Sequence, residues 1–354
     1  ARVFVLESEI LMFNFMFITY NLSGRHKSGA PLTWEEKCSL VQDPRFHLVL
    51  HTSNPDTDTH AFVAASDDRI VIGFRGTVSL ANVKTDMDSA LVEHQLARRV
   101  KPLMQAGDDG KTPVSRSGAE YGQAYTSPLV HGGFLKAYES VRAEVTEAVQ
   151  RLLAEKPDRV VFVTGHSLGG GLACLCAFDM AVGPVGLPPN SVALTTWGCP
   201  RVGNYSFSRR FARVVPAATR FVCEGDVITK LPFQPPLRDL TFRGWFHLGV
   251  EIVLSPTGNA IIRPSPIERF ITKRRLSSVE AHLRMSYGAA LMAWTLRAHY
   301  GSGFMGDWWL VVVNTLFARD PQKTLRSVHP RVREVLLDSL CRPGVAYMSG
   351  KRMV

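Results

Sequence analysis

The feature that most constrains the fold is the pentapeptide GHSLG at positions 165–169, which follows the apolar run 160–163. A buried strand therefore runs directly into a sharp turn, and the small-residue segment 170–182 predicts a helix after it. The flanking residues Gly165 and Gly169 must be small in such a turn, because larger side chains would collide. The turn places Ser167 at the N-terminal end of the helix, whose dipole favours developing negative charge. We interpret this segment as a nucleophile elbow; the alternative is an ordinary strand, turn and helix with an incidental serine.

The rest of the chain alternates between strand-like and helix-like segments. With 354 residues and 45% hydrophobic composition, it is long enough for one large core, although length alone also allows two domains. Short β-rich runs predict strands at 61–64, 70–74, 192–197, 219–223 and 248–254, and helical spacing predicts helices at 134–154, 205–214 and 279–296. This alternation predicts an α/β fold with a mostly parallel central sheet and helices on both faces.

A nucleophilic serine needs a general base and an acid that orients the base. In α/β-hydrolases the acid and then the histidine follow the serine along the chain. Asp226 is the preferred acid, because it comes directly after a predicted strand and so lies at the carboxyl edge of the sheet. Two histidines, His247 and His282, follow it and both remain candidates on this reasoning. The weaker acid candidates are Asp179, Asp239 and Glu224.

Seven segments in a fixed order support a family assignment. They are FRGT at 74–77, VHGGF at 130–134, GHSLGG at 165–170, GCPRVGN at 198–204, GDV at 225–227 with LP at 231–232, FHLGVE at 246–251, and AHL at 281–283 with YG at 287–288. In this order they resemble the class 3 lipase family, which contains fungal triacylglycerol lipases and plant acyl hydrolases. The resemblance covers roughly residues 45–298 and implies an α/β-hydrolase fold.

The resemblance also assigns roles to individual residues. It implies a triad of Ser167, Asp226 and His282, with His282 as the base. It implies an oxyanion hole formed by the backbone N–H groups of Thr77 and Leu168. It implies no metal and no organic cofactor.

Two other histidines in these segments, His247 and His131, are expected to have structural roles. His247 leads into a strand and is expected to be a hydrogen-bonding histidine. His131 is expected in the turn that starts the helix at 134–154, although its HGG sequence superficially resembles the oxyanion motif of other esterases.

The implied activity is that of a serine carboxylester hydrolase acting on lipid esters, in the first place an acylglycerol lipase. Phospholipase A1 and galactolipid acyl hydrolase activities are the alternatives, because the same triad serves all three. A more distant alternative is a lipase-like scaffold that binds partners without catalysis. The expected partners are a lipid ester substrate and, through peripheral contact, a lipid or membrane interface.

The family pattern suggests boundaries along the chain. We expect an N-terminal helical segment (1–44) packed on the core, a catalytic domain (45–298) with a lid region at 78–130, and a C-terminal extension (299–354). Asn82 and Asp86 match the lid-hinge pattern. The long stretch 95–129 is either a large lid or a disordered surface insertion, and the apolar run 308–313 is expected to pack on the core.

Charge and cysteine usage add weaker expectations. The net charge of +10 is spread over short basic clusters, which fit a solvated surface or attraction to an anionic membrane. These clusters are not interleaved with aromatic residues, so no nucleic-acid partner is expected. Four of the six cysteines lie in predicted core segments, which favours buried free thiols. With no signal peptide visible in the printed sequence, we expect an intracellular, membrane-associated location.

Overall fold

A computed structural model of the protein describes residues 6–20, 45–76, 90–101, 127–233, 244–265, 267–268 and 278–300. In these ranges the central sheet has eight strands in the order β1-β2-β3-β6-β7-β9-β11-β12. Its strands are β1 (His47–Asn54), β2 (Thr59–Ala65), β3 (Arg69–Phe74), β6 (Val160–His166), β7 (Val192–Trp197), β9 (Ala217–Cys223), β11 (Val250–Leu254) and β12 (Ala260–Ile262).

The direction of the strands confirms the predicted mostly parallel sheet. Strands β3, β6, β7, β9 and β11 are parallel neighbours, while β1, β2 and β12 form antiparallel pairs at the two edges of the sheet. The carboxyl ends of the parallel strands therefore meet at one edge of the sheet. In an open α/β sheet this is the edge where sites are built.

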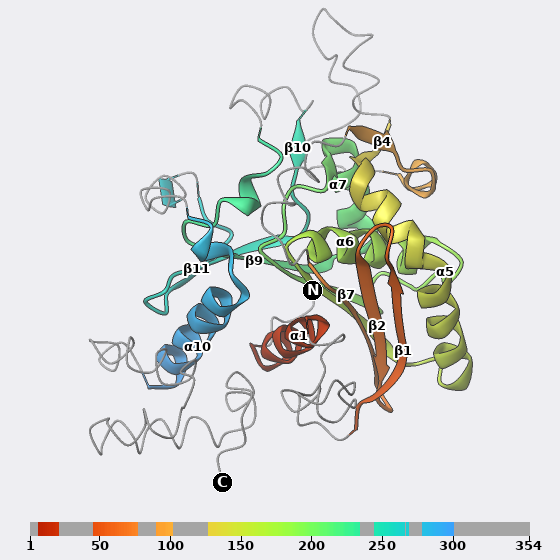
Figure 1. Ribbon diagram of the computed structural model, residues 1–354, viewed down its shortest axis with the longest axis horizontal. Helices are drawn as coiled ribbons and strands as arrows, with labels where there is room; N and C mark the ends of the chain where they lie inside the picture. Colours follow the sequence, from red (N-terminus) through yellow and green to blue (C-terminus); the bar gives the residue numbers. More distant parts are fainter. Residues whose placement is uncertain are drawn as a thin grey trace, which may run out of the picture.

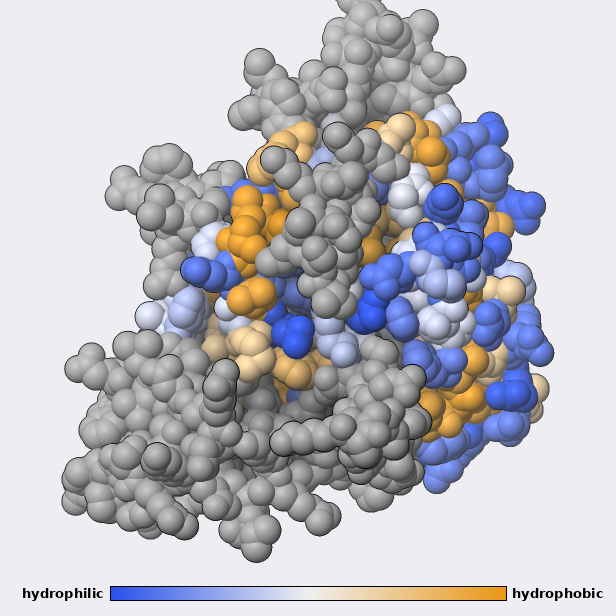
Figure 2. Space-filling model, in the orientation of Figure 1, coloured by the Kyte–Doolittle hydropathy of each residue, from blue (hydrophilic) through white to orange (hydrophobic). Residues whose placement is uncertain are grey.

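Helices cover both faces of the sheet, as predicted. Figure 1 shows α1 and α10 on one side and α5 and α6 on the other. The helices are α1 (Leu6–Thr19), α5 (Gly132–Glu155), α6 (Leu168–Val182), α7 (Tyr205–Val214) and α10 (Arg284–Tyr300). Helix α5 buries one apolar stripe against the sheet, and the side of the molecule where it lies is largely hydrophilic in Figure 2.

The apolar helix α1 is part of the core. Phe15, Met16 and Ile18 are fully buried, and Phe13 packs edge-on against Trp197 with 4.9 Å between ring centroids. Each such side chain stabilises the fold by about 1.5–3 kcal/mol through the apolar area it removes from water. Residues 10–19 therefore lie in a core helix. Within the described part of the chain, no helix is both long and apolar enough to cross a membrane.

A second, smaller sheet was not predicted. It has four short strands in the order β10-β8-β5-β4, all antiparallel: β10 (Trp245–Phe246), β8 (Gly203–Asn204), β5 (Leu129–His131) and β4 (Leu91–Glu93). Strand β4 and the 3₁₀ helix η2 (Leu96–Arg99) fall inside the expected lid region at 78–130. Part of that region therefore has regular secondary structure. Asn82, Asp86 and the apolar run at 308–313 lie outside the described residues.

The thiols in the described part of the chain are buried and free. They belong to Cys174, Cys176, Cys199 and Cys223. This confirms the expectation for these four, whereas Cys38 and Cys341 lie outside the described residues.

Stability is expected to fall as the pH is lowered from about 6.5 to about 4, because of His94. This side chain is 5% exposed, and its Nδ1 accepts the backbone N–H of Ala97 at 3.2 Å. Burial lowers the pKa of His94 to about 4. Between that value and the ordinary histidine pKa of about 6.5, the unfolded chain holds more protons than the folded one. Full stability is therefore present above this window and is lost as pH falls through it.

The measurement is the unfolding midpoint in urea at several pH values across this window. The variant His94→Asn keeps an acceptor near Ala97 but cannot take up a proton. We expect a shallower loss of stability with falling pH in this variant than in the wild type. Equal slopes in the two proteins would show that His94 does not carry this dependence.

Candidate active site

The nucleophile elbow forms at the junction of β6 and α6. Ser167 has φ +58° and ψ −129°, a conformation that non-glycine residues rarely adopt. Two backbone hydrogen bonds hold it there: the Ser167 N–H donates to the Trp197 carbonyl at 2.9 Å, and the Ser167 carbonyl accepts the Gly170 N–H at 3.0 Å. The backbone around Ser167 is thus strained and firmly supported.

The spacing of glycines around Ser167 follows from the close approach of three backbone segments. A Cβ on Gly165 would lie 2.2 Å from the carbonyl oxygen of Gly169, and a Cβ on Gly169 would lie 2.4 Å from the carbonyl oxygen of Phe74. Real Cβ atoms do not come so close to backbone atoms, so both positions must be glycine unless the backbone moves. This geometry accounts for the G-x-S-x-G pattern.

Ser167, His282 and Asp226 lie in one hydrogen-bonded series. The Ser167 Oγ is 2.8 Å from His282 Nε2, and His282 Nδ1 is 2.9 Å from Asp226 Oδ2. A carboxylate only accepts, so Nδ1 carries the proton and Nε2 is left to accept the serine hydroxyl. All three side chains are buried, at 1–2% exposure. The structure therefore brings together the three residues that the sequence analysis selected.

Each triad residue comes from a different element. Ser167 ends the turn after β6, and Asp226 lies in the loop after β9, at the carboxyl edge of the sheet. His282 is the last residue of the 3₁₀ helix η4 (Glu280–His282), ahead of α10, rather than in one continuous helix over 279–296. Three separate chain segments must therefore keep their positions for the series to form.

The Asp226 carboxylate has two further donors. Its Oδ1 accepts the backbone N–H of Ile228 at 2.8 Å, and its Oδ2 also accepts the Tyr287 hydroxyl at 2.6 Å. Burial raises the pKa of Tyr287 well above its ordinary value, so this hydroxyl stays a donor. The role of Tyr287 was missed in the sequence, where the residue appeared only within the segment that resembles the family.

Of the competing residues, Asp179 and His247 are not part of this series, and Asp239 lies outside the described residues. Asp179, on α6, accepts the Tyr138 hydroxyl at 2.9 Å and pairs with Arg142 at 2.6 Å. His247 lies between β10 and β11 and is not part of the hydrogen-bonded series. His131 is the N-cap of α5, where its Nδ1 accepts the Phe134 N–H at 3.3 Å. Its expected place at the start of that helix is what the structure shows.

One of the two expected oxyanion donors lies in the described part. Leu168 is the first residue of α6, where the backbone N–H has no partner within the helix. Thr77 lies outside the described residues, but the preceding Gly76 reaches the elbow: a Cβ there would lie 3.1 Å from the Ser167 Cβ. In the described ranges no group of three or more His, Cys, Asp and Glu side chains is arranged to hold a metal ion.

Comparison with known proteins gives a consistent result. A family model described as lipase (class 3) matches residues 71–235. The chain is 33% identical over 222 residues to a lipase of Rhizomucor miehei, covering 62% of this chain and 51% of that protein. It is 29% identical over 226 residues to "Secreted mono- and diacylglycerol lipase 2" of Gibberella zeae, covering 64% and 49%. It is also 32% identical over 189 residues to "Phospholipase A1-Igamma1, chloroplastic" of Arabidopsis thaliana, covering 48% and 35%.

Solved lipase structures are similar to this chain as well. Lipase II from Rhizopus niveus superposes with a TM-score of 0.60 at 25% identity, covering 78% of this chain and 92% of that one. The fold and the elbow therefore define an α/β-hydrolase. The comparisons support the class 3 lipase family for this chain. It spans about half the length of the first curated relatives it matches.

Proposed function

We propose that the protein is a serine carboxylester hydrolase that cleaves lipid esters through an acyl-enzyme on Ser167. The observation that carries the proposal is the continuous hydrogen bonding from Ser167 through His282 to Asp226 on a strained elbow. Such a series makes a weakly acidic hydroxyl nucleophilic, because the histidine can take its proton as attack occurs.

In the proposed reaction, His282 Nε2 takes the Ser167 proton as Oγ attacks the ester carbonyl. The tetrahedral intermediate collapses to an acyl-enzyme, and the protonated His282 gives its proton to the leaving alcohol. Water then attacks the acyl-enzyme with His282 again as base, which releases the fatty acid and restores Ser167. Asp226 keeps the imidazole in the required tautomer and stabilises the imidazolium.

The oxyanion of each tetrahedral intermediate needs donors that are already in place. We assign the backbone N–H groups of Leu168 and Thr77 to this role. The position of Leu168 at the start of α6 supports the first assignment, since the helix dipole adds to its N–H. The second rests on the resemblance and on the approach of Gly76 to Ser167.

Exposed apolar side chains close to His282 in the chain support a lipid substrate met at an interface. Val279 and Leu283, on either side of His282 in the chain, are 45% and 43% exposed. Figure 2 shows hydrophobic side chains on both sides of the central grey atoms on the viewed face. Apolar residues exposed beside a site are typical of surfaces that contact lipid or protein.

Acylglycerols are the substrates we favour, because the first curated relatives include a mono- and diacylglycerol lipase. Phospholipase A1 activity is the second candidate, since two plant proteins with that name match at 32% and 31% identity. Galactolipid hydrolysis would use the same triad, and the experiment below therefore includes a galactolipid substrate.

The test is fatty-acid release from a diacylglycerol emulsion, phosphatidylcholine vesicles and galactolipid vesicles, measured by titration at constant pH. We expect fatty-acid release from all three acyl-ester substrates, and we expect diacylglycerol to be hydrolysed fastest. Faster release from phosphatidylcholine would establish the second candidate instead. A folded protein that releases no fatty acid from any substrate would overturn the proposal and favour the non-catalytic scaffold.

A further inference from the structure

A tyrosine at the end of α1 contacts the residue beside the nucleophile. The Tyr20 hydroxyl lies 2.7 Å from His166 Nδ1, although the two residues are 146 positions apart. The same hydroxyl comes close to Gly76, where a Cβ would lie 2.4 Å from the Tyr20 oxygen. Tyr20 thus lies between the end of β3 and the elbow, in direct contact with both.

The hydrogen bonds of His166 have one consistent assignment. Its Nε2 is 2.8 Å from the backbone carbonyl of His282, and a carbonyl only accepts, so Nε2 carries the proton. Burial, and next the nearby His282, lower the pKa of His166 well below its ordinary value, so the ring is neutral. Nδ1 is therefore an acceptor, and the Tyr20 hydroxyl is its donor.

His166 in turn supports the triad histidine from two directions. It holds the main chain of His282 through Nε2, and its ring stacks on the His282 ring with 4.7 Å between centroids. Helix α10 joins the same contact, because the Arg284 guanidinium lies 4.6 Å from the centre of the Tyr20 ring. The hydroxyl of Tyr20 is thus the outermost donor of a Tyr20–His166–His282 series.

We propose that Tyr20 is a positioning residue: its hydroxyl fixes the tautomer of His166, which then holds the main chain and ring of His282 where Nε2 reaches Ser167. This rests on the proposed hydrolase function. It makes α1 a part of the site as well as of the core. Without the hydroxyl, Nδ1 of His166 is a buried acceptor with no donor, and the bond from Nε2 to the His282 carbonyl is the one hydrogen bond left to hold the ring.

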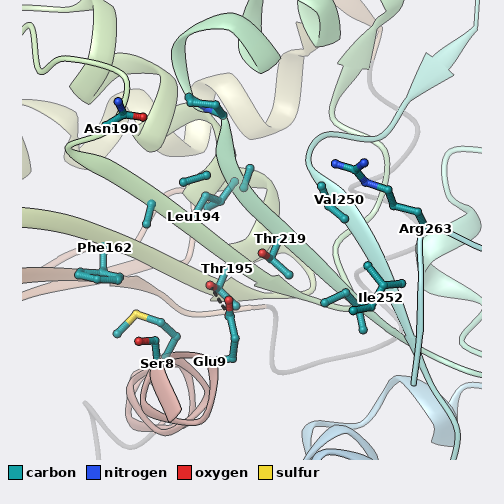
Figure 3. Close-up of a pocket in the computed structure, with 16 residues that line it drawn as sticks. Ser8, Glu9, Phe162, Asn190, Leu194, Thr195, Thr219, Val250, Ile252 and Arg263 are labelled. Atoms are coloured by element: carbon teal, nitrogen blue, oxygen red, sulfur yellow. Dashed lines mark hydrogen bonds between the residues drawn. The ribbon is translucent and has the colours of Figure 1, made fainter. Parts of the chain in front are cut away.

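The variant Tyr20→Phe removes only the hydroxyl. Thr195→Val is the matched control, because the Thr195 hydroxyl donates to Glu9 of α1 at 2.7 Å, as Figure 3 shows, and is likewise a single bond between α1 and the sheet. None of the triad residues lines the cavity in which this pair lies. A soluble short-chain p-nitrophenyl ester keeps interfacial effects out of the measurement.

We expect Tyr20→Phe to lower kcat by about 10- to 100-fold with little change in KM, as small displacements of a triad do. Thr195→Val is expected to lower the thermal midpoint while kcat stays close to the wild-type value. In a His166→Phe background, Tyr20→Phe is expected to lower kcat no further, since the two act through one series. Wild-type kcat in Tyr20→Phe, or an equal loss in Thr195→Val, would overturn the inference.

Nuclear magnetic resonance of the wild-type protein gives a second test that does not depend on a folded variant. With ¹⁵N-labelled histidine, His166 is expected to be neutral, with its proton on Nε2. A proton on Nδ1 would overturn the inference even if Tyr20→Phe fails to fold. A wild-type protein without esterase activity would contradict the proposed function. The NMR measurement of the His166 tautomer does not depend on that activity, so the two failures can be told apart.

Discussion

Replacing Ser167 with alanine is expected to lower kcat for ester hydrolysis by at least about 10⁴-fold, because the acyl-enzyme loses its only attachment point. The fold should survive. Alanine removes one oxygen, and the backbone bonds from Ser167 to Trp197 and Gly170 do not involve the side chain. KM for a soluble ester should change little, since the hydroxyl contributes mainly to the transition state. Steady-state kinetics together with thermal unfolding separates these effects.

A second buried serine provides the control for Ser167→Ala. Ser66 is 2% exposed and donates to Asp68 at 2.9 Å in the turn before β3, at the opposite end of that strand from the elbow. Ser66→Ala should cost some stability and leave kcat near the wild-type value. Comparable activity in Ser167→Ala and the wild type would refute Ser167 as the nucleophile.

Asp226→Asn is expected to lower kcat by about 10⁴-fold, the scale seen when the acid of such a triad is neutralised. The two carboxylate oxygens accept from His282, Tyr287 and the Ile228 backbone. Asparagine has a single oxygen, so at least one of these donors faces an amide NH₂. If that donor is His282, its proton moves to Nε2 and the ring no longer accepts from Ser167.

Asp179→Asn is the matched control for this change, because Asp179 is equally buried and also accepts a tyrosine hydroxyl. We expect Asp179→Asn to lower the unfolding midpoint, since it weakens a partly buried pair with Arg142. Its kcat should fall far less than that of Asp226→Asn. Equal losses of kcat in the two variants would mean that Asp226 acts through stability alone.

The elements that were predicted correctly are those whose apolar residues form a local pattern along one continuous stretch of the chain. Strand β7 and helix α7 begin and end where the apolar run and the helical spacing predicted. Strand β1 was missed because it is an edge strand in which only Thr52 is buried, so its apolar residues do not alternate cleanly. The strands of the smaller sheet have two or three residues each, too few for any periodicity.

The residues of the site also fall into two groups, those that a local sequence pattern predicts and those that it does not. Ser167 was predictable because the elbow is a local pattern, and Asp226 because it follows a strand. His282 could be separated from His247 only through the family resemblance. Tyr20 could not be predicted at all, because a hydrogen bond to a residue 146 positions away leaves no pattern in either segment. Thr77 lies outside the described residues, so its role stays a prediction.

The central claim, a nucleophilic Ser167 activated by His282, is tested most directly by covalent labelling. The protein is treated with a p-nitrophenyl alkylphosphonate, which transfers its phosphonyl group to an activated serine, and is then digested and analysed by mass spectrometry. Our account predicts one adduct per chain, on Ser167, with activity lost in proportion and no labelling of Ser167→Ala. Labelling of a different residue in parallel with the loss of activity, or full hydrolysis with Ser167 unmodified, would contradict it.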